Sequence, residues 1–360
     1  MSKDLLRQRI PEGMMDLLPE TAGLLEDLER DMMDLFRLWA YDRVTTPTVE
    51  FAACVQTELD REDHLFKFFD RSGRILALRP EFTPPIARMV SSRMHDMQFP
   101  LRLSYGGSVF RNTSGRQREF RQIGVELIGS ASAMADAEII ALAIEALRAL
   151  GIEEFQLSVG EMNIFSGLIE ECGIGADVRE QLENALSRKD LVAIEQMAEN
   201  HQISEQARRI LRRLPHLRGG AEILDEVSRL SDQSAVRSAV AHLRQVYDYL
   251  GAFGVQDALV LDMGVLREFA YYTGIVFEGY VAGIAFPVIE GGRYDHLYDD
   301  FRHLMAATGF ALNLSSLLKF FPRKGLMPDQ RLIDGDDPEA VIRRCREERA
   351  QGKRTAMALK

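Results

Sequence analysis

The sequence predicts an α+β protein in which one mainly antiparallel sheet is covered by helices and the chain carries a helical insertion. Segments of alternating apolar residues gather in two parts of the chain, up to residue 164 and again from residue 258. The stretch between them, residues 165–257, contains almost no β-branched alternation and is expected to form short helices. Residues 1–164 and 258–321 are therefore expected to form one core, followed by a polar C-terminal stub at residues 322–360.

The elements of the first part follow from local patterns. A helix is expected from Pro19 to about Tyr41, with apolar residues at helical spacing. Pro47 interrupts the next extended stretch, which suits an edge or interface strand. Pro84 and Pro85 stand at a helix entry, where a missing N–H costs little. The other expected elements are a hairpin of strands 66–70 and 74–78, strands 101–110, 117–129 and 155–159, and a helix at 136–150.

The insertion and the second part follow in the same way. Helices are expected at 177–187, 191–200, 204–214, 221–230 and 234–250. Beyond them we expect strands at 258–262, 275–281 and 284–289, a tight turn at 291–295, and a buried helix at 310–320. In the tail, a helix begins at residues 337–339 and an apolar run at 355–359. A helix and one strand cannot bury a core of their own, so the stub is an appendage or an incomplete unit.

Composition narrows the class of protein. The chain has 360 residues, a net charge of −11 and a hydrophobic fraction of 46%, as an ordinary soluble globular protein has. The acidic balance provides no overall field for tRNA or DNA. Cys54, Cys172 and Cys345 show no metal-ligand spacing and indicate free thiols in a reducing compartment. No signal peptide and no apolar run of membrane-spanning length is evident, so a cytoplasmic location without membrane contact is expected.

The most informative stretch is residues 110–129, FRNTSGRQREFRQIGVELIG. It predicts a hairpin of two strands with a cationic tip. Clustered guanidinium groups are planar, bidentate donors, so an anion is expected nearby: a carboxylate, a phosphate or nucleic acid. An exposed charged turn that only keeps the protein soluble is the alternative. The arginines of this hairpin are Arg111, Arg116, Arg118 and Arg121.

Two pairs of residues are candidates for holding a ligand. Glu81 and Thr83 stand at a strand-to-helix turn, where the helix N-terminus adds donors; capping of that helix is the alternative. Gln122 and Glu126 are four residues apart on one strand and therefore share a face. Such a pair can hold a cationic or hydrogen-bonding ligand if the face is buried, and merely faces solvent if it is not.

Two later stretches add tyrosines and an arginine. Arg267, Tyr271 and Tyr272 lie beside a strand, where an arginine can hold a ligand carboxylate. A surface arginine beside two core tyrosines is the alternative. Tyr294 lies in the sequence GGRYD, interpreted as a turn that glycine permits.

These residues include no evident catalyst. The seven histidines are scattered, none lies in a metal-ligand spacing or beside a candidate Ser or Cys, and no P-loop or Gly-rich dinucleotide turn is present. No catalytic residue, metal or cofactor is therefore expected. The set suits a zwitterion, with carboxylates and tyrosines for an ammonium or imidazole group and arginine for a carboxylate. It predicts a receptor site rather than a catalytic one.

In order along the chain, these stretches resemble the catalytic core of histidyl-tRNA synthetases, which have the class II aminoacyl-tRNA synthetase fold. The resemblance covers about 310 residues, from PEGMMDLLPE through LRPEFTPPIAR, LREFAYYTGIVFEGY and EGGRYDHLYDDF to GFALNLSSLLKF. Pro47 matches the dimer-interface proline of the family's first motif, which implies a homodimer. The resemblance implies histidine-binding roles for Glu81, Thr83, Arg111, Gln122, Glu126, Arg267, Tyr271, Tyr272 and Tyr294.

The departures from the family concern ATP and tRNA. Thr113 stands where the second motif has a glutamate that reads adenine, and the hairpin loop is shorter by about three residues. The third motif should end in Gly-Leu-Glu-Arg, but Asn313, Leu314, Ser315 and Ser316 occupy these positions. Each loss removes on the order of 1–3 kcal/mol of ATP interaction. Only residues 322–360 represent the anticodon-binding domain, so the resemblance implies neither amino-acid activation nor tRNA binding.

This combination resembles the synthetase-like regulatory subunits of ATP phosphoribosyltransferase, the first enzyme of histidine biosynthesis. That family implies a non-catalytic chain, a homodimer within a hetero-octamer, and a short-form catalytic subunit as the partner that requires it. It also implies feedback inhibition by free histidine, which is allostery between two chains. Two alternatives remain open, an active histidyl-tRNA synthetase with unusual motifs and an orphan synthetase paralogue that binds histidine.

Overall fold

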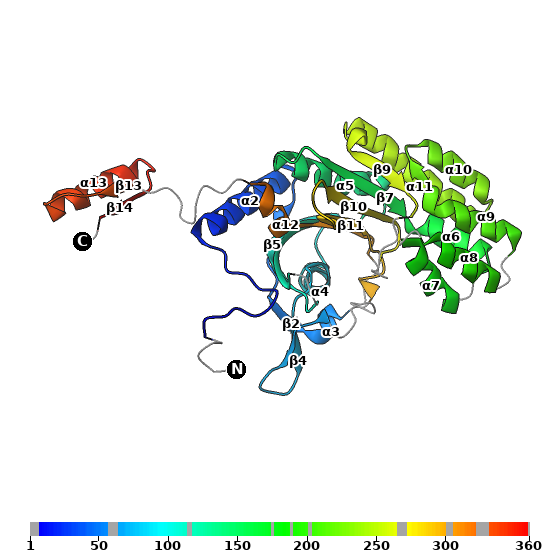
Figure 1. Cartoon of the computed structure of the whole chain (residues 1–360), viewed down its shortest axis with the longest axis horizontal. Helices are drawn as coiled ribbons and strands as arrows, with labels where there is room; N and C mark the ends of the chain where they lie inside the picture. Colours follow the sequence, from blue (N-terminus) through cyan, green and yellow to red (C-terminus); the bar gives the residue numbers. More distant parts are fainter. Residues whose placement is uncertain are drawn as a thin grey trace.

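A nine-stranded sheet forms the centre of the molecule, in the order β1-β5-β6-β12-β11-β10-β7-β9-β8 (Figure 1). A computed structural model describes residues 7–56, 64–113, 117–173, 176–187, 190–200, 204–264, 272–299, 305–321 and 331–358. The pairs β1–β5 and β7–β9 are parallel and the other pairs antiparallel, so the predicted α+β fold is confirmed. The strands are β1 (Asp42–Arg43), β5 (Leu101–Phe110), β6 (Glu119–Ile128), β7 (Phe155–Glu161), β8 (Arg218–Gly219), β9 (Leu259–Asp262), β10 (Ile275–Val281), β11 (Ile289–Arg293) and β12 (Ala307–Asn313).

One face of the sheet is covered by α2 (Pro19–Leu38) and α5 (Ala133–Ala149). Alanine, isoleucine and leucine occupy most positions of α5, which is why nearly the whole helix is buried. Phe36 of α2 packs against Phe310 of β12, with ring centroids 5.9 Å apart in an edge-to-face geometry. Among the described residues, no helix has the length and apolar character needed to cross a bilayer.

The opposite face carries α4 (Thr83–Arg93) and a second apolar cluster. Phe82, just before the helix, stacks on Tyr105 of β5 with ring centroids 4.5 Å apart. Pro84 and Pro85 lie in the first turn of α4, as predicted from the sequence. This face, with its short helix, holds the candidate site.

A smaller sheet of three strands, in the order β2-β4-β3, projects from the core. It comprises β2 (Val49–Phe51), β3 (Lys67–Phe69) and β4 (Ile75–Leu78), with α3 (Ala52–Val55) packed beside it. The predicted hairpin of β3 and β4 is confirmed. Pro47 lies outside the strands, two residues before β2.

The predicted insertion contains five helices close to the predicted positions. They are α7 (Ala176–Ser187), α8 (Leu191–Asn200), α9 (Glu205–Arg213), α10 (Glu222–Leu230) and α11 (Ser234–Ala252). The helix α6 (Met162–Glu171) and the strand β8 were not predicted. Because β8 joins the central sheet and α11 packs on α5, this region is attached directly to the core. The boundaries at residues 165 and 257 stay an interpretation.

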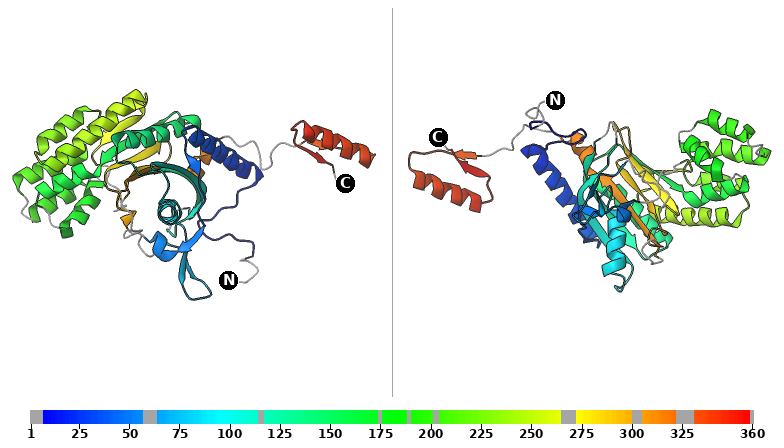
Figure 2. Two further views of the ribbon diagram at one scale, coloured as in Figure 1. Left: turned by 180° about the vertical axis from the view of Figure 1, so that it is seen from behind. Right: turned by 90° about the horizontal axis from the view of Figure 1, so that it is seen from below.

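The C-terminal region forms a small βαβ unit of β13 (Arg331–Ile333), α13 (Pro338–Ala350) and β14 (Thr355–Met357). Its two strands are parallel, and the first was not predicted. Asp337 caps α13 by accepting a hydrogen bond from the Glu339 N–H at 3.0 Å. The unit and the helical insertion lie at opposite ends of the long axis of the molecule (Figure 2).

Two sequence predictions near the end of the core are wrong. The helix predicted at 310–320 begins too early, because residues 310–313 belong to β12; helical structure covers α12 (Leu314–Leu317) and the 3-10 helix Leu318–Phe320 that follows it. Residues 289–293 form β11, so the strand predicted at 284–289 lies too early and the predicted turn begins inside the strand. Glycine serves close packing there, since a Cβ at Gly291 would lie 2.4 Å from the Phe277 ring and 2.6 Å from the Gly309 oxygen.

Candidate ligand-binding site

A cavity lies on the face of the sheet that carries α4. About 370 Å³ in and around it is free of protein atoms, a figure that includes solvent outside its mouth. Two predicted site residues, Arg267 and Tyr271, lie outside the described residues. The structure brings the other predicted residues together from separate stretches of the chain. They are Glu81, Thr83, Arg111, Gln122, Glu126, Tyr272 and Tyr294.

Glu126 is the buried carboxyl group of this cavity, with 1% of the residue exposed. Thr83 Oγ1 donates to Glu126 Oε1 at 2.8 Å, and the Tyr294 hydroxyl donates to Oε2. Burial raises the pKa of Glu126 to about 8, with a smaller contribution from the Glu81 carboxylate and against the effect of the two hydrogen bonds. A cationic ligand group beside Glu126 would stabilise its charged form.

Gly309 makes room for this carboxyl group. It is the register partner of Glu126 on β12, and a Cβ at this position would lie 2.0 Å from Glu126 Oε2. The same Cβ would lie 2.5 Å from the Val125 carbonyl oxygen. The side chain of Glu126 therefore lies across the neighbouring strand at a position that only glycine leaves open.

Gln122 lies four residues before Glu126 on β6, and the two side chains therefore share one face of the strand. The residue is 4% exposed, so the solvent-facing alternative for the Gln122–Glu126 pair is wrong. Its Oε1 atom has no hydrogen-bond partner among the described residues. A buried acceptor without a donor costs about 1–3 kcal/mol, so a ligand N–H is the partner expected here.

Arg111 is the cationic side chain in the described lining of the cavity. Its Nε donates to the Pro80 carbonyl at 3.1 Å, and the guanidinium lies 5.3 Å from the centre of the Phe120 ring. These contacts hold the group at the cavity wall. Arg111 can therefore present its positive charge to an anionic ligand group.

The other described arginines of the hairpin, Arg118 and Arg121, make contacts within the protein. Arg121 Nε donates to Glu29 Oε2 at 2.6 Å, and Arg43 pairs with the other oxygen of Glu29 at 2.8 Å. Arg118 Nε donates to the Thr113 carbonyl at 3.2 Å. The tip, residues 114–116, lies outside the described residues. Among the described arginines, the predicted anion site therefore depends on Arg111.

The residues after β12 stabilise the local backbone. Asn313 Oδ1 accepts from the Ser316 N–H at 3.2 Å and caps α12. Ser315 Oγ accepts from the Arg121 N–H at 2.8 Å. The end of the third motif therefore carries small polar residues in this chain, and the side chains of Asn313 and Ser315 accept hydrogen bonds from its own backbone.

Sequence reasoning missed four lining residues: Glu290, Gly309, Phe310 and Ala311. Alternation from Glu290 through Gly292 to Tyr294 would have placed Glu290 on the cavity face. The interpretation of GGRYD as a turn hid that signal. Glu290 adds a third carboxyl group to those of Glu81 and Glu126 in the lining.

This fold and this cavity define a protein of the histidyl-tRNA synthetase class. The family model for histidyl-tRNA synthetase matches residues 13–317, which include every predicted site residue.

Comparison with individual proteins identifies a narrower family within this class. An "ATP phosphoribosyltransferase regulatory subunit" of Desulfitobacterium hafniense is 49% identical, covering 100% of this chain and 94% of the relative. One from Moorella thermoacetica is 42% identical, covering 98% and 92%. A solved "ATP phosphoribosyltransferase regulatory subunit/histidyl-tRNA synthetase" from Bacillus halodurans has a TM-score of 0.90 at 32% identity, covering 97% of this chain and 92% of that one. The chain therefore belongs to the family of ATP phosphoribosyltransferase regulatory subunits.

Proposed function

We propose that this regulatory subunit, itself without catalytic activity, binds free histidine in the cavity around Glu126. In the cytoplasm it would activate a short-form ATP phosphoribosyltransferase catalytic subunit and convey feedback inhibition by histidine to it. The observation that carries the proposal is that seven of the nine predicted histidine-binding residues, all those that the structure describes, line one cavity. The names of the relatives support the catalytic partner.

The chemistry of the cavity matches the groups of histidine. Glu126, held by Thr83 and Tyr294, faces the imidazole or the ammonium group, and charge-assisted hydrogen bonds of this kind contribute roughly 1.5–3 kcal/mol each. The unpaired Oε1 of Gln122 accepts a ligand N–H. Arg111 is placed to bind the carboxylate.

We include Arg267 and Tyr271 in the same site, because Tyr272, the residue that follows them, lines the cavity. In this proposal Arg267 also contacts the ligand carboxylate, and Tyr271 and Tyr272 form one wall. Histidine then lies between the hairpin of residues 110–129 and the stretch 267–272.

Activity of the complex tests the function directly. ATP phosphoribosyltransferase activity of a short-form catalytic subunit is measured with and without this chain, across a range of histidine concentrations. We expect activity to require the chain and to fall as histidine rises. If the mixture gains no activity over the catalytic subunit alone, the proposed function is wrong.

A second assay separates the two alternatives. An active histidyl-tRNA synthetase catalyses histidine-dependent exchange between ATP and pyrophosphate, and we expect none from this chain because Thr113 and Ser316 replace the glutamate and the arginine that contact adenine in those enzymes. Robust exchange would overturn the regulatory assignment. An orphan paralogue would bind histidine without activating the catalytic subunit.

The homodimer within a hetero-octamer is part of the same proposal. Strand register puts Val49 and Phe51 of β2, Leu76 and Leu78 of β4, and Phe68 of β3 on one face of the small sheet. Val49, Phe51 and Phe68 are 40–48% exposed. A continuous apolar face of this kind, beside Pro47, supports a protein–protein contact, which we assign to a second copy of the chain.

A further inference from the structure

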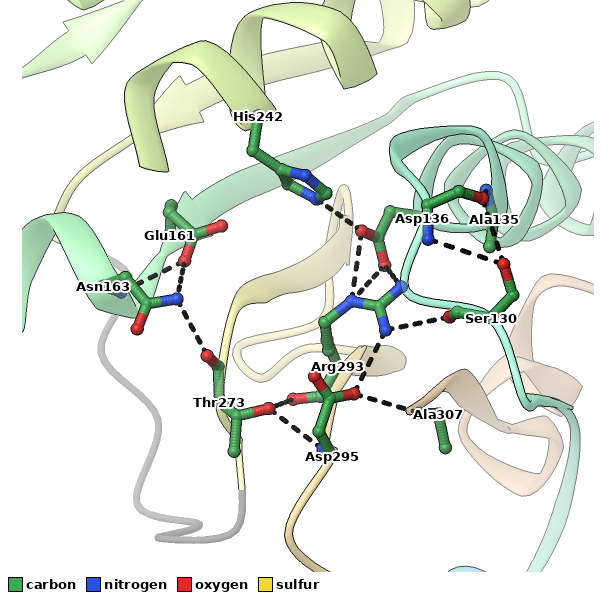
Figure 3. Close-up of polar contacts among 11 residues, drawn as sticks. Ser130, Ala135, Asp136, Glu161, Asn163, His242, Thr273, Arg293, Asp295 and Ala307 are labelled. Atoms are coloured by element: carbon green, nitrogen blue, oxygen red, sulfur yellow. Dashed lines mark hydrogen bonds and ion pairs between the residues drawn. The ribbon is translucent and has the colours of Figure 1, made fainter. Parts of the chain in front are cut away.

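A buried polar cluster lies between α5 and β11, and Figure 3 shows its contacts. Asp136 of α5 and Arg293 of β11 are 1% and 5% exposed. Arg293 Nη2 donates to Asp136 Oδ1 at 2.9 Å, and Arg293 Nε donates to Oδ2 at 3.2 Å. His242 of α11 contacts the same carboxylate through Nε2, 2.8 Å from Oδ2. One buried carboxylate thus holds a side chain of the sheet and a side chain of the helical insertion.

The cluster is joined to the cavity through β11. Arg293 and Tyr294 are consecutive, so their side chains leave the backbone on opposite faces. Arg293 binds Asp136 on one face, while Tyr294 donates to Glu126 on the other. Any movement of the backbone at this point changes both contacts.

A second connection passes through Thr273, the neighbour of the cavity residue Tyr272. The Thr273 N–H donates to the Arg293 carbonyl at 2.8 Å. The Asp295 N–H donates to Thr273 Oγ1 at 2.9 Å, and Arg293 Nη1 donates to Asp295 Oδ1 at 3.1 Å. Tyr272 and Tyr294, which both line the cavity, are therefore each next in sequence to a residue that the cluster holds in place, Thr273 and Arg293.

Two helices contact this assembly: α6, which leads from the core into the insertion, and α11 of the insertion. Asn163, in the first turn of α6, donates through Nδ2 to the Thr273 carbonyl at 2.9 Å, and Glu161 caps the helix. His242 provides the contact of α11, and its hydrogen bond to Asp136 raises the pKa of His242, which favours the charged ring beside the carboxylate. Breaking a buried ion pair such as Asp136–Arg293 would leave an uncompensated buried charge, so the two side chains move as a unit.

We propose that Asp136 is a positioning residue for Tyr272 and Tyr294, and that His242 couples the position of these tyrosines to the helical insertion. When a ligand fills the cavity and fixes the tyrosines, the contact between His242 and Asp136 is fixed with them, and α6 and α11 become more rigid. The inference rests on the proposed function for the identity of the ligand. Coupling between two sites is reciprocal, so a change at His242 alters histidine affinity by the same factor.

Hydrogen–deuterium exchange of the full-length chain, with and without free L-histidine, tests this coupling. The variants are His242→Ala, which removes the contact, and His242→Gln, whose amide can still donate to Asp136. The matched control is Asp257→Asn, which removes an exposed ion pair between Arg148 of α5 and the end of the insertion. Calorimetric titration of each variant with L-histidine measures affinity.

In the wild-type protein and in Asp257→Asn, we expect histidine to slow amide exchange in β11, α6 and α11. In His242→Ala, protection of β11 persists, protection of α11 is lost, and affinity falls about fivefold. His242→Gln restores the protection of α11 and the affinity for histidine. The inference alone is overturned if histidine protects α11 in His242→Ala as much as in the wild type. It is also overturned if histidine protects β11 but not α11 in the wild type. If the wild-type protein binds no histidine, the proposed function fails as well.

Discussion

Replacing Glu126 by glutamine tests the electrostatics of the cavity directly. Glutamine has nearly the shape of a protonated glutamate. Its carbonyl oxygen accepts from one of the two hydroxyls of Thr83 and Tyr294, and its NH2 group donates to the other, which then accepts instead of donating. It never ionises. The variant therefore separates the charge of Glu126 from its packing.

The expected difference in unfolding free energy between the wild type and Glu126→Gln follows from the pKa of Glu126. This pKa is about 8 in the folded protein, against an ordinary value of 4.5. Above pH 4.5 the unfolded chain releases a proton that the folded protein still holds, so the free energy of unfolding falls as pH rises toward 8. Each pH unit in this window costs about 1.4 kcal/mol. Between pH 5 and pH 7.5 the wild-type protein should lose about 3 kcal/mol that Glu126→Gln keeps.

Urea unfolding of both proteins at pH 5, 6, 7 and 7.5 measures this difference. The free energies of unfolding should converge near pH 5 and separate in favour of Glu126→Gln as pH rises. Histidine affinity at pH 7.5 should fall at least about tenfold, because a neutral amide cannot pair with a cation. Parallel stability curves across the whole range would refute the assignment of Glu126 as a buried, largely protonated group.

Three further substitutions test packing, assembly and the hairpin. Gly309→Ala should displace the carboxyl group of Glu126, lower the free energy of unfolding in urea by about 1–3 kcal/mol and abolish histidine binding in calorimetry. The control is Gly23→Ala in α2, which has open space around its Cβ and should be neutral or stabilising. Phe68→Glu should convert the dimer to a monomer in light scattering, and Phe69→Glu, on the other face of the small sheet, should not; a dimeric Phe68→Glu would exclude this interface. Glu29→Ala leaves two arginines without their carboxylate and should cost about 1–3 kcal/mol of unfolding free energy; unchanged stability would show that these pairs contribute nothing.

The sequence predicted the long elements well because their patterns are local. The ten-residue strands β5 and β6 alternate clearly, and α5 and α11 have apolar residues at helical spacing. The errors fell on β11 and β12, where glycine and alanine stand at central positions. Such residues carry little propensity for strands, and their place in the sheet comes from pairing with neighbours on both sides.

The sequence by itself determined most of the candidate site residues, though not Glu290 or the lining from β12, because a fixed order of motifs along the chain carried the resemblance, and carboxylates, an amide and arginines suit a zwitterion. Only the tertiary structure determined which of these residues are buried, which are paired and how their pKa values shift. The raised pKa of Glu126 requires burial by β12, and Arg121 is engaged by Glu29, 92 residues away. The contact between Arg293 and Asp136 spans 157 residues. Burial and pairing at such separations depend on how strands and helices meet in space, which no local pattern of side chains records.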